Sequence, residues 1–315
     1  MNLSLPIVSI IIPAHNHAEY LAEAIESVLA QDYPGTELIV LDDGSTDSTR
    51  EVLARYKGRF FWESHANMGQ ARTLNKGWKI ARGEILGKLS ADDTLLPQAI
   101  SEVVRVLQDN PRALVAYPDF QLIDPNSATV RTLLLDDFDY HTMLVETECA
   151  IGTGALFRRR ALELVGDWNP ALPQTLDYDF WLRAGLYGEI VHVPKVLATF
   201  RVHPHSQSYR PMSEQVAQEP VRVVSALFDH PDLPQQYKSM RNLGIANAHI
   251  VTAQLHLRAG RVASAWHSMR NAQRLAPASL VRWRTMRALA NALFNRTAHK
   301  LLWTIRGLFG RERLG

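Results

Sequence analysis

Short apolar runs and amphipathic segments alternate through roughly the first hundred positions of the 315-residue chain. The runs are rich in β-branched residues, as buried strands are, and the segments between them repeat apolar residues at helical spacing. The predicted strands cover residues 7–12, 37–41, 60–62 and 84–89, and the predicted helices cover 20–29, 46–53, 68–81 and 95–107. Repeated strand–helix units predict an α/β fold: a mostly parallel, Rossmann-like sheet with helices on both faces.

Composition excludes several classes of protein. The chain is 46% hydrophobic and 21% charged, which are globular values, and a single cysteine, Cys149, cannot form an intramolecular disulfide. No apolar stretch approaches the ~20 residues of a membrane span. The N-terminus lacks a basic region, and Pro13 interrupts its apolar run, so it is expected to form a first strand and not a signal peptide. We therefore expect a cytoplasmic protein.

Charge is distributed unevenly along the chain. From Leu233 to the end there are 14 basic residues and one acidic residue, Glu312, whereas acidic residues outnumber basic ones before that point. Beyond Met212 the pattern is helical throughout. We therefore predict two domains, an α/β domain over residues 1–210 and an all-helical, basic C-terminal region over residues 211–315. A basic module of this kind attracts phosphate, in nucleic acid or in anionic lipid.

Pairs of acidic residues follow two of the predicted strands. Asp42 and Asp43 follow the second strand, and Asp92 and Asp93 come shortly after the fourth. Ligands of such sheets bind beyond the carboxyl ends of the strands, and Mg²⁺ or Mn²⁺ offsets the repulsion between adjacent carboxylates. The simpler interpretation is a turn with a helix cap, for example by Asp93 or Thr94 before the helix predicted from residue 95.

Two further clusters lie later in the chain. Asp177 and Asp179 open an apolar helix, where the helix dipole favours carboxylates and where one of them is also a candidate general base. His203 and His205 follow a predicted strand. They are candidates for a metal ligand or a phosphate contact, although an isolated histidine is more often structural.

Together these segments resemble the family 2 glycosyltransferases, which are inverting, nucleotide-sugar-dependent enzymes of the GT-A fold. The matching stretches occur in the family's order, cover roughly residues 5–208, and read VSIIIPAHN, ELIVLDDGSTDST, NMGQARTLNKGWKIARGEILGKLSADD, GTGALFRRRALELVGDWN, TLDYDFWLR and FRVHPHSQS. The resemblance implies a GT-A sheet for the first domain. It also implies a donor that is an NDP-sugar, most often a UDP-sugar.

The resemblance also assigns roles to individual residues. The donor-binding residues would be Pro13, Ala14, His15, Asn16, Asp43, Arg72, Asp92 and His203, with Asp43 holding the nucleotide base. The ligands of Mg²⁺ or Mn²⁺ would be Asp92, Asp93 and His203, and the catalytic base would be Asp177. In such enzymes the ion stabilises the leaving diphosphate while the base deprotonates the acceptor hydroxyl, so that one displacement inverts the anomeric centre.

The chain departs from the family pattern at two positions. Ser90 stands where the family often has an aspartate, so the metal motif lacks its first carboxylate. His15 stands where a tyrosine is common, which affects stacking on the nucleotide base. Metal dependence and base specificity are therefore the properties in which we expect this chain to differ from its relatives.

Two other functions compete with this interpretation. A nucleotidyltransferase uses a similar sheet and metal, but the glycine-rich phosphate loop that normally follows its first strand is replaced here by PAHNHAEY. A catalytically degenerate sugar-nucleotide-binding protein would act through its basic tail. The presence together of Asp43, Asp92, Asp93 and Asp177 argues against that alternative.

The last predicted helix is amphipathic. One arc of about 120° collects its apolar residues, Trp283, Met286, Ala290, Leu293, Phe294, Leu301, Ile305 and Leu308. Such a helix either packs on the enzyme or lies on an anionic membrane, and the sequence favours neither. With the resemblance, this predicts a peripheral enzyme on the inner face of the plasma membrane that builds bacterial surface polysaccharide on a glycan or lipid-linked acceptor. We expect no nucleic-acid partner.

Overall fold

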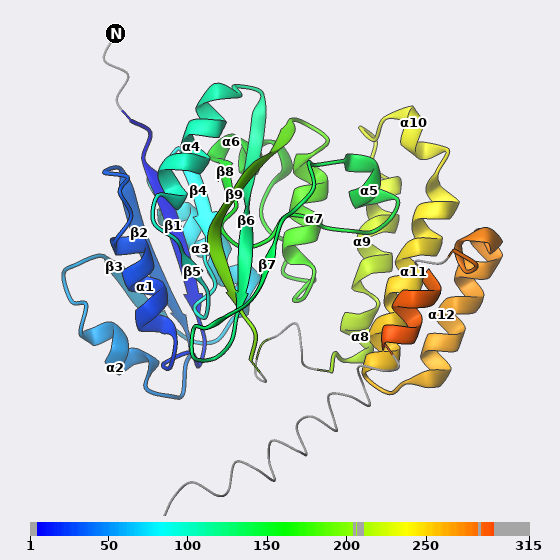
Figure 1. The fold of residues 1–315 in the computed structure, drawn as a ribbon, viewed down its shortest axis with the longest axis horizontal. Helices are drawn as coiled ribbons and strands as arrows, with labels where there is room; N and C mark the ends of the chain where they lie inside the picture. Colours follow the sequence, from blue (N-terminus) through cyan, green and yellow to red (C-terminus); the bar gives the residue numbers. More distant parts are fainter. Residues whose placement is uncertain (1–4, 204–205, 207–210, 283–284, 293–315) are drawn as a thin grey trace, which may run out of the picture. The chain divides into compact units, whose positions relative to one another are not determined.

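The computed structural model describes residues 5–203, 206, 211–282 and 285–292 (Figure 1). Contacts divide the chain into two compact units, Met1–Tyr140 with Cys149–Tyr209 and His141–Glu148 with Arg210–Gly315. The second unit includes a segment that the sequence pattern assigned to the first domain. The physical reason is burial, because Met143, Leu144 and Val145 are buried and Asn247 Nδ2 donates to the Val145 carbonyl at 2.8 Å.

Nine strands of the described residues form one sheet in the order β3-β2-β1-β4-β8-β6-β9-β5, with β7 paired to β6 (Figure 1). Their bounds are β1 (Val8–Ala14), β2 (Thr36–Asp43), β3 (Phe61–His65), β4 (Ile85–Lys88), β5 (Thr94–Leu95), β6 (Ala113–Ile123), β7 (Thr129–Leu133), β8 (Leu156–Arg158) and β9 (Glu189–Arg201). Strands β1 to β4 pair in parallel, as β6 and β9 do, whereas β8 is antiparallel to both of its neighbours. The predicted α/β fold is confirmed.

Helices cover both faces of this sheet because alternate side chains of each strand point to opposite sides. The helices of the first unit are α1 (Leu21–Leu29), α2 (Thr49–Ala54), α3 (Gln70–Ile80), α4 (Ala99–Asp109), α6 (Arg159–Val165) and α7 (Leu176–Ala184); α5 (Tyr140–Leu144) spans the division between the units. Ile10 and Ile12 share a core with α1 and α4. Ile11 faces α3, where a Cβ added to Gly77 would lie 2.7 Å from its Cγ2.

Two elements begin or end at other residues than the sequence predicts, because strands far apart in the chain pair with each other. Helix α4 begins at Ala99 and not near residue 95, because Thr94–Leu95 pair with β9 as β5. Neither Asp93 nor Thr94 therefore caps that helix. The apolar runs at residues 190–193 and 196–200 predict two short strands, but β9 is continuous over both, since a register shift between Pro118 and Asp119 of β6 accommodates the proline at 194.

In the part of the second unit that the structure describes, every regular element is a helix. Its remaining helices are α8 (Glu214–Ala217), α9 (Glu219–Phe228), α10 (Gln235–Lys238), α11 (Arg241–Arg258), α12 (Val262–Leu275), the 3-10 helix Pro277–Ser279 and a helical segment over 285–292. Small buried residues such as Ala253 and Ala265 let α11 and α12 pack closely. Within the described residues no helix is long and apolar enough to cross a bilayer. Most of the predicted amphipathic arc, including Trp283, Leu293, Phe294, Leu301, Ile305 and Leu308, lies outside the described residues.

Candidate active site

The loops after β1, β2 and β4 begin at the same edge of the sheet. Ala14 pairs with Asp42 at the ends of β1 and β2, and Ile11 pairs with Lys88 at the end of β4. Because these strands are parallel, their carboxyl ends gather the polar residues that the sequence singled out. This edge is the candidate active site.

Asn16 joins the loops that follow β1 and β2. Its side-chain Oδ1 accepts a hydrogen bond from the Thr46 amide at 2.7 Å, and its own amide donates to Ser45 Oγ at 2.9 Å. His15 Nδ1 lies 2.9 Å from the Asp43 carbonyl oxygen. Asn16 also adopts a positive φ of 56°, which asparagine tolerates better than most residues. The predicted donor residues His15, Asn16 and Asp43 thus lie together.

The Asp43 carboxylate is held by backbone amides. Its two oxygens accept from Met68 at 2.7 Å and Gly69 at 3.0 Å, and the residue is 3% exposed. The following Gly44 has a φ of +71°, and a Cβ there would lie 2.6 Å from the Asn67 amide nitrogen. Only glycine fits this turn, so the Asp-Asp-Gly segment is shaped to fix Asp43 against the loop after β3.

Asp42 has a structural role instead. It is fully buried, and its carboxylate accepts from the Ser45 amide at 2.9 Å, from Arg50 Nε at 3.0 Å and from Ser64 Oγ at 2.5 Å. Burial acts to raise the pKa of Asp42, but these hydrogen bonds outweigh it and hold the pKa below its usual value. The carboxylate of Asp42 therefore stabilises the turn after β2, as the structural interpretation of the acidic pair predicted. Asp43 is then the member of the pair that is the candidate for ligand binding.

Three other predicted donor residues lie at the margin of this arrangement. Pro13 and Ala14 are the last residues of β1 and are buried in the sheet. Arg72 is exposed on α3, and its guanidinium donates to the Met68 carbonyl at 3.3 Å. Their assignment to the donor stays a prediction.

Asp92 and His203 lie together, as the metal prediction requires. Asp92 Oδ2 is 3.0 Å from His203 Nε2 and 3.8 Å from His17 Nε2, and the three atoms lie within 4.8 Å of one another. Burial acts to raise the pKa of Asp92, but the hydrogen bond from His203 and the charge of the imidazoles bring it below its usual value. Imidazole and carboxylate donors at this spacing fit a divalent cation such as Mn²⁺. The sequence did not single out His17, and the predicted ligand Asp93 is not part of this group.

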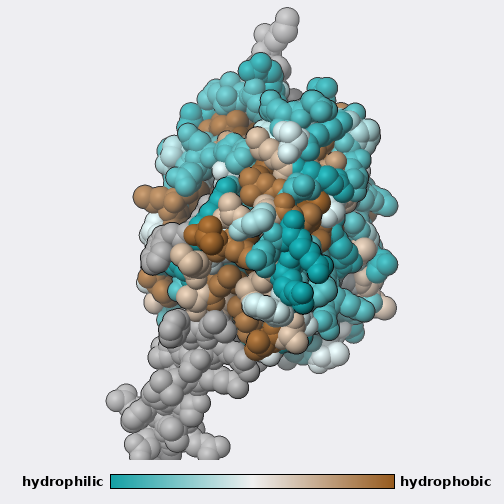
Figure 2. Space-filling view, turned by 90° about the vertical axis from the view of Figure 1, so that its right-hand side faces the viewer, coloured by the Kyte–Doolittle hydropathy of each residue, from teal (hydrophilic) through white to brown (hydrophobic). Residues whose placement is uncertain are grey.

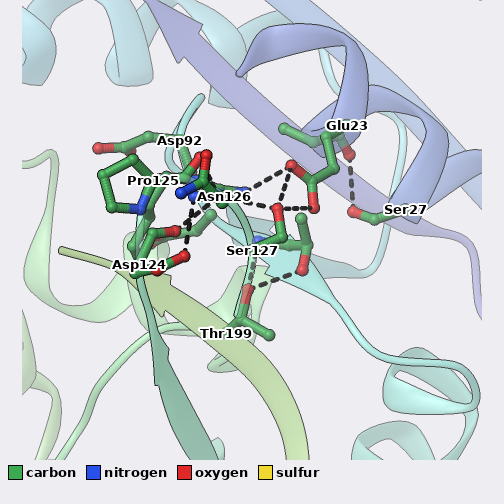
Figure 3. A network of polar contacts seen from close by, with 12 residues as sticks. Glu23, Ser27, Asp92, Asp124, Pro125, Asn126, Ser127 and Thr199 are labelled. Atoms are coloured by element: carbon green, nitrogen blue, oxygen red, sulfur yellow. Dashed lines mark hydrogen bonds and ion pairs between the residues drawn. The ribbon is translucent and has the colours of Figure 1, made fainter. Parts of the chain in front are cut away.

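Arg201, at the end of β9, organises the Asp92–Asp93 loop. Its amide donates to Asp93 Oδ1 and its Nε to the Asp92 carbonyl, both at 2.9 Å. Its remaining nitrogens reach Glu23 Oε2 at 2.6 Å and Ser127 Oγ at 2.9 Å, and Figure 3 shows Glu23, Asp92 and Ser127 gathered in this network. Arg201 is 1% exposed. A charged residue directly after the mostly apolar run of residues 196–200 was the sequence signal that could have identified it.

A cavity of about 420 Å³ lies beside this loop. Its lining is mainly apolar and aromatic, from Phe120, Leu122, Leu133, Ile151, Phe157, Trp168, Trp181 and Phe200. Lys88, Ser90, Asp93 and Asp177 also line it. Burial and the negative charge of Asp92 raise the pKa of Asp93 to about 8, so this carboxyl group is mostly protonated at neutral pH. The predicted base Asp177 and the Asp93 carboxyl group therefore share one cavity.

The two acidic residues that open α7 have different surroundings. Asp177 is half-buried in the first turn of the helix and lines the cavity. Asp179 Oδ2 accepts from Arg183 Nε at 3.0 Å and from its terminal nitrogen at 2.7 Å. Arg183 in turn donates to the carbonyls of Val165 and Asp167. Asp179 thus fixes α7 to the loop after α6.

Comparison with known proteins identifies the family. The sequence model of glycosyl transferase family 2 matches residues 9–166, and the chain belongs to that family. An uncharacterised glycosyltransferase of Rickettsia felis is 33% identical over 220 residues, which cover 66% of this chain and 36% of that protein. The match thus spans little more than a third of that relative's length.

Solved structures show the same GT-A fold. Residues 1–349 of Staphylococcus aureus TarS, crystallised with UDP-GlcNAc, align with a TM-score of 0.60 and 15% identity over 87% of this chain and 91% of that one. The mannosyltransferase PcManGT of Pyrobaculum calidifontis, in complex with GDP-Man and Mn²⁺, aligns with a TM-score of 0.61 and 19% identity over 98% and 89%. The predicted family and fold are confirmed.

Proposed function

We propose that the protein is an inverting glycosyltransferase that moves a sugar from an NDP-sugar, most simply a UDP-sugar, to a glycan or lipid-linked acceptor. One observation carries the proposal. Asp92 is paired with His203, while the adjacent Asp93 lines an apolar cavity together with Asp177. An inverting transferase needs both features, because the acceptor hydroxyl attacks the anomeric carbon on the side opposite the bond to the leaving diphosphate.

In this arrangement each residue has one task. Asp43, whose carboxylate is fixed by the amides of Met68 and Gly69, would hold the nucleotide base. Asp92 and His203 would hold a Mg²⁺ or Mn²⁺ ion, which when bound stabilises the negative charge of a leaving diphosphate. Asp177 would accept the proton of the acceptor hydroxyl as that oxygen attacks. A single displacement with one base and no protein nucleophile inverts the anomeric centre.

The cavity supports a carbohydrate acceptor. Its aromatic residues, Trp168, Trp181, Phe120 and Phe200, offer flat apolar surfaces, and the few polar groups among them can fix an orientation. The apolar C–H faces of a sugar ring suit such walls, whereas its hydroxyl groups suit Asp93, Ser90 and Asp177. A glycan, or a lipid-linked sugar whose sugar end enters the cavity, meets both requirements.

A donor screen tests the proposed function. The protein is incubated with UDP-, GDP- and dTDP-sugars, with and without Mn²⁺, and the released nucleotide is measured. We expect nucleoside diphosphate to be released from one nucleotide class, and only with the metal. The related structures in complex with UDP-GlcNAc and with GDP-Man define the first donors to try. Failure of all three classes to bind, as judged by calorimetry, would argue against the function.

We further propose that the helical domain, residues 211–315, holds the enzyme to an anionic membrane surface at the inner face of the plasma membrane. Figure 2 shows apolar side chains exposed among hydrophilic ones on the face of the helical unit. Helix α12 exposes Val262 (58%) and Trp266 (60%), and Arg270 and Arg274 are exposed on the same helix. An exposed tryptophan beside basic residues is typical of interfacial helices.

The membrane proposal predicts salt-sensitive binding to vesicles. Each Lys or Arg near an anionic bilayer contributes about 1 kcal/mol, screened by salt, whereas an inserted tryptophan resists salt. The protein should sediment with phosphatidylglycerol vesicles at low salt and be partly released at high salt. Trp266→Ala should reduce the salt-resistant fraction, and Tyr187→Ala, which removes an exposed aromatic residue of the other unit, should not. Binding to DNA but not to vesicles would instead support a nucleic-acid partner.

A further inference from the structure

We propose that His17 is a third protein ligand of the divalent cation, so that this chain holds the ion with two imidazoles and one carboxylate. The inference rests on the proposed function in one respect, because it takes the ion to be the one that neutralises the donor diphosphate. His17 lies in the loop between β1 and α1, 75 residues before Asp92. It belongs to none of the metal-ligand positions that the sequence predicted.

The geometry of the three ligand atoms fits one ion. Bonds of ~2.1 Å at right angles place neighbouring ligand atoms ~3 Å apart. The separation of Asp92 Oδ2 and His203 Nε2 is 3.0 Å, and that of Asp92 Oδ2 and His17 Nε2 is 3.8 Å. The 3.8 Å between His17 Nε2 and Asp92 Oδ2 is too long for a hydrogen bond. A shift of the His17 ring by less than about 1 Å would bring both atoms to the ~3 Å separation of neighbouring ligands of one ion.

The tautomer of His17 is already set for ligation. Its Nδ1 lies 2.8 Å from the His15 carbonyl oxygen, and because a carbonyl only accepts, Nδ1 carries the proton. In the neutral form of the ring, which is the form that binds a metal, the lone pair is therefore on Nε2, the atom that lies 3.8 Å from Asp92 Oδ2. Metal-binding histidines are oriented in this way, with the other ring nitrogen donating to a carbonyl or carboxylate.

The backbone of His17 is also fixed. Its amide donates to Thr49 Oγ1 at 3.2 Å, and its carbonyl accepts from the amides of Tyr20 and Leu21 at the start of α1. The side chain of His17 is 29% exposed, compared with 15% for Asp92 and 4% for His203. Of the three ligand residues, His203 is thus buried, and His17 is the one most open to solvent. An ion and a diphosphate can enter from the His17 side.

This donor set predicts a metal preference. Mg²⁺ favours oxygen donors, whereas imidazole nitrogen suits the transition metals. Two imidazoles should therefore make the site select Mn²⁺ or Co²⁺ over Mg²⁺. They would also offset the missing carboxylate at Ser90, since a nitrogen ligand replaces the oxygen ligand that the sequence lacks.

The test measures metal binding directly, without donor and without turnover. Mn²⁺ is titrated into the full chain, free Mn²⁺ is followed by electron paramagnetic resonance, and Mg²⁺ competes. We expect His17→Ala to weaken Mn²⁺ binding by about 10- to 100-fold or more, the range known for loss of ligand support, and to weaken Mg²⁺ binding less. His17→Gln serves if the alanine variant fails to fold. His65→Ala is the control, because His65 lies 3.6 Å from Asp43 Oδ1 and outside the group.

A spectroscopic readout separates ligation from an indirect effect. Electron spin-echo modulation of bound Mn²⁺ should show nitrogen coupling from two imidazoles in the wild type, and from one in His17→Ala. Unchanged Mn²⁺ affinity and unchanged nitrogen coupling in that variant would overturn the inference. Unchanged Mn²⁺ affinity with weaker UDP binding would also overturn it, and would assign His17 to the phosphate. None of these results depends on sugar transfer, so a failed donor screen leaves them interpretable.

Discussion

Replacing Asp177 with asparagine should lower kcat by about 10²- to 10⁴-fold, the usual contribution of a general base. Asparagine keeps the size of the side chain but cannot accept a proton at working pH. Asp177 lines the apolar cavity and does not lie in the Asp92–His203–His17 group, so donor binding should be nearly unchanged. Steady-state kinetics gives kcat, and calorimetry with the nucleotide gives the affinity.

The matched control is Asp179→Asn, two residues along the same helix turn. Asp179 carries the same charge but is engaged by Arg183, which ties α7 to the loop after α6. We expect this variant to lower the melting temperature and to change kcat far less. If Asp177→Asn keeps its activity and Asp179→Asn is inactive while folded, the base has been assigned to the wrong carboxylate.

Removing divalent metal should reduce turnover at least ~100-fold, and added Mn²⁺ should restore it. A bound cation supplies several kcal/mol of stabilisation to developing negative charge, and each 1.36 kcal/mol corresponds to about tenfold in rate. The Asp92–His203 pair is the feature that motivates this prediction. Treatment with EDTA, dialysis and readdition of Mn²⁺ or Mg²⁺ provides the measurement.

The variant Asp92→Asn tests the same metal site by removing one of its proposed ligands. The Arg201 guanidinium bonds the Asp92 backbone carbonyl, so the loop should keep its position when the carboxylate is lost. We expect activity close to that of the EDTA-treated enzyme, without rescue by millimolar Mn²⁺. Full activity of the wild type in EDTA would remove the metal role and would mark Ser90 as the signature of a metal-independent variant.

The sequence predicted the parts of this molecule that follow from local patterns. Apolar periodicity located β1, β2, β4 and the helices between them, because buried strands and amphipathic helices leave different spacings. It did not predict β5, since Thr94–Leu95 form a strand only through pairing with β9, a contact between residues about a hundred positions apart. The same long-range pairing displaced the start of α4.

The candidate site divides in the same way. The resemblance to the family singled out Asp43, Asp92 and Asp177. In the structure Asp43 ends β2, Asp92 lies beside His203 and Asp177 lines the cavity. It could not reveal that Asp42 is saturated by Arg50 and two serines, because those partners are set by the folded turn. His17 and Arg201 were missed because their roles come from contacts with Asp92, which lies far from both in the sequence. The periodicity of a single sequence contains no information about such long-range contacts.

The most direct test of the account identifies the bond that breaks in the donor. Phosphorus NMR of the reaction with Mn²⁺ distinguishes a nucleoside diphosphate from a nucleoside monophosphate. We expect the wild type to cleave the bond between the anomeric carbon and the diphosphate oxygen and to release intact nucleoside diphosphate, and we expect Asp177→Asn and Asp92→Asn to release almost none. Cleavage between the two phosphorus atoms, which releases sugar 1-phosphate and passes the nucleoside monophosphate group to water or another acceptor, would contradict this expectation and would make the protein act as a nucleotidyl-transferring enzyme.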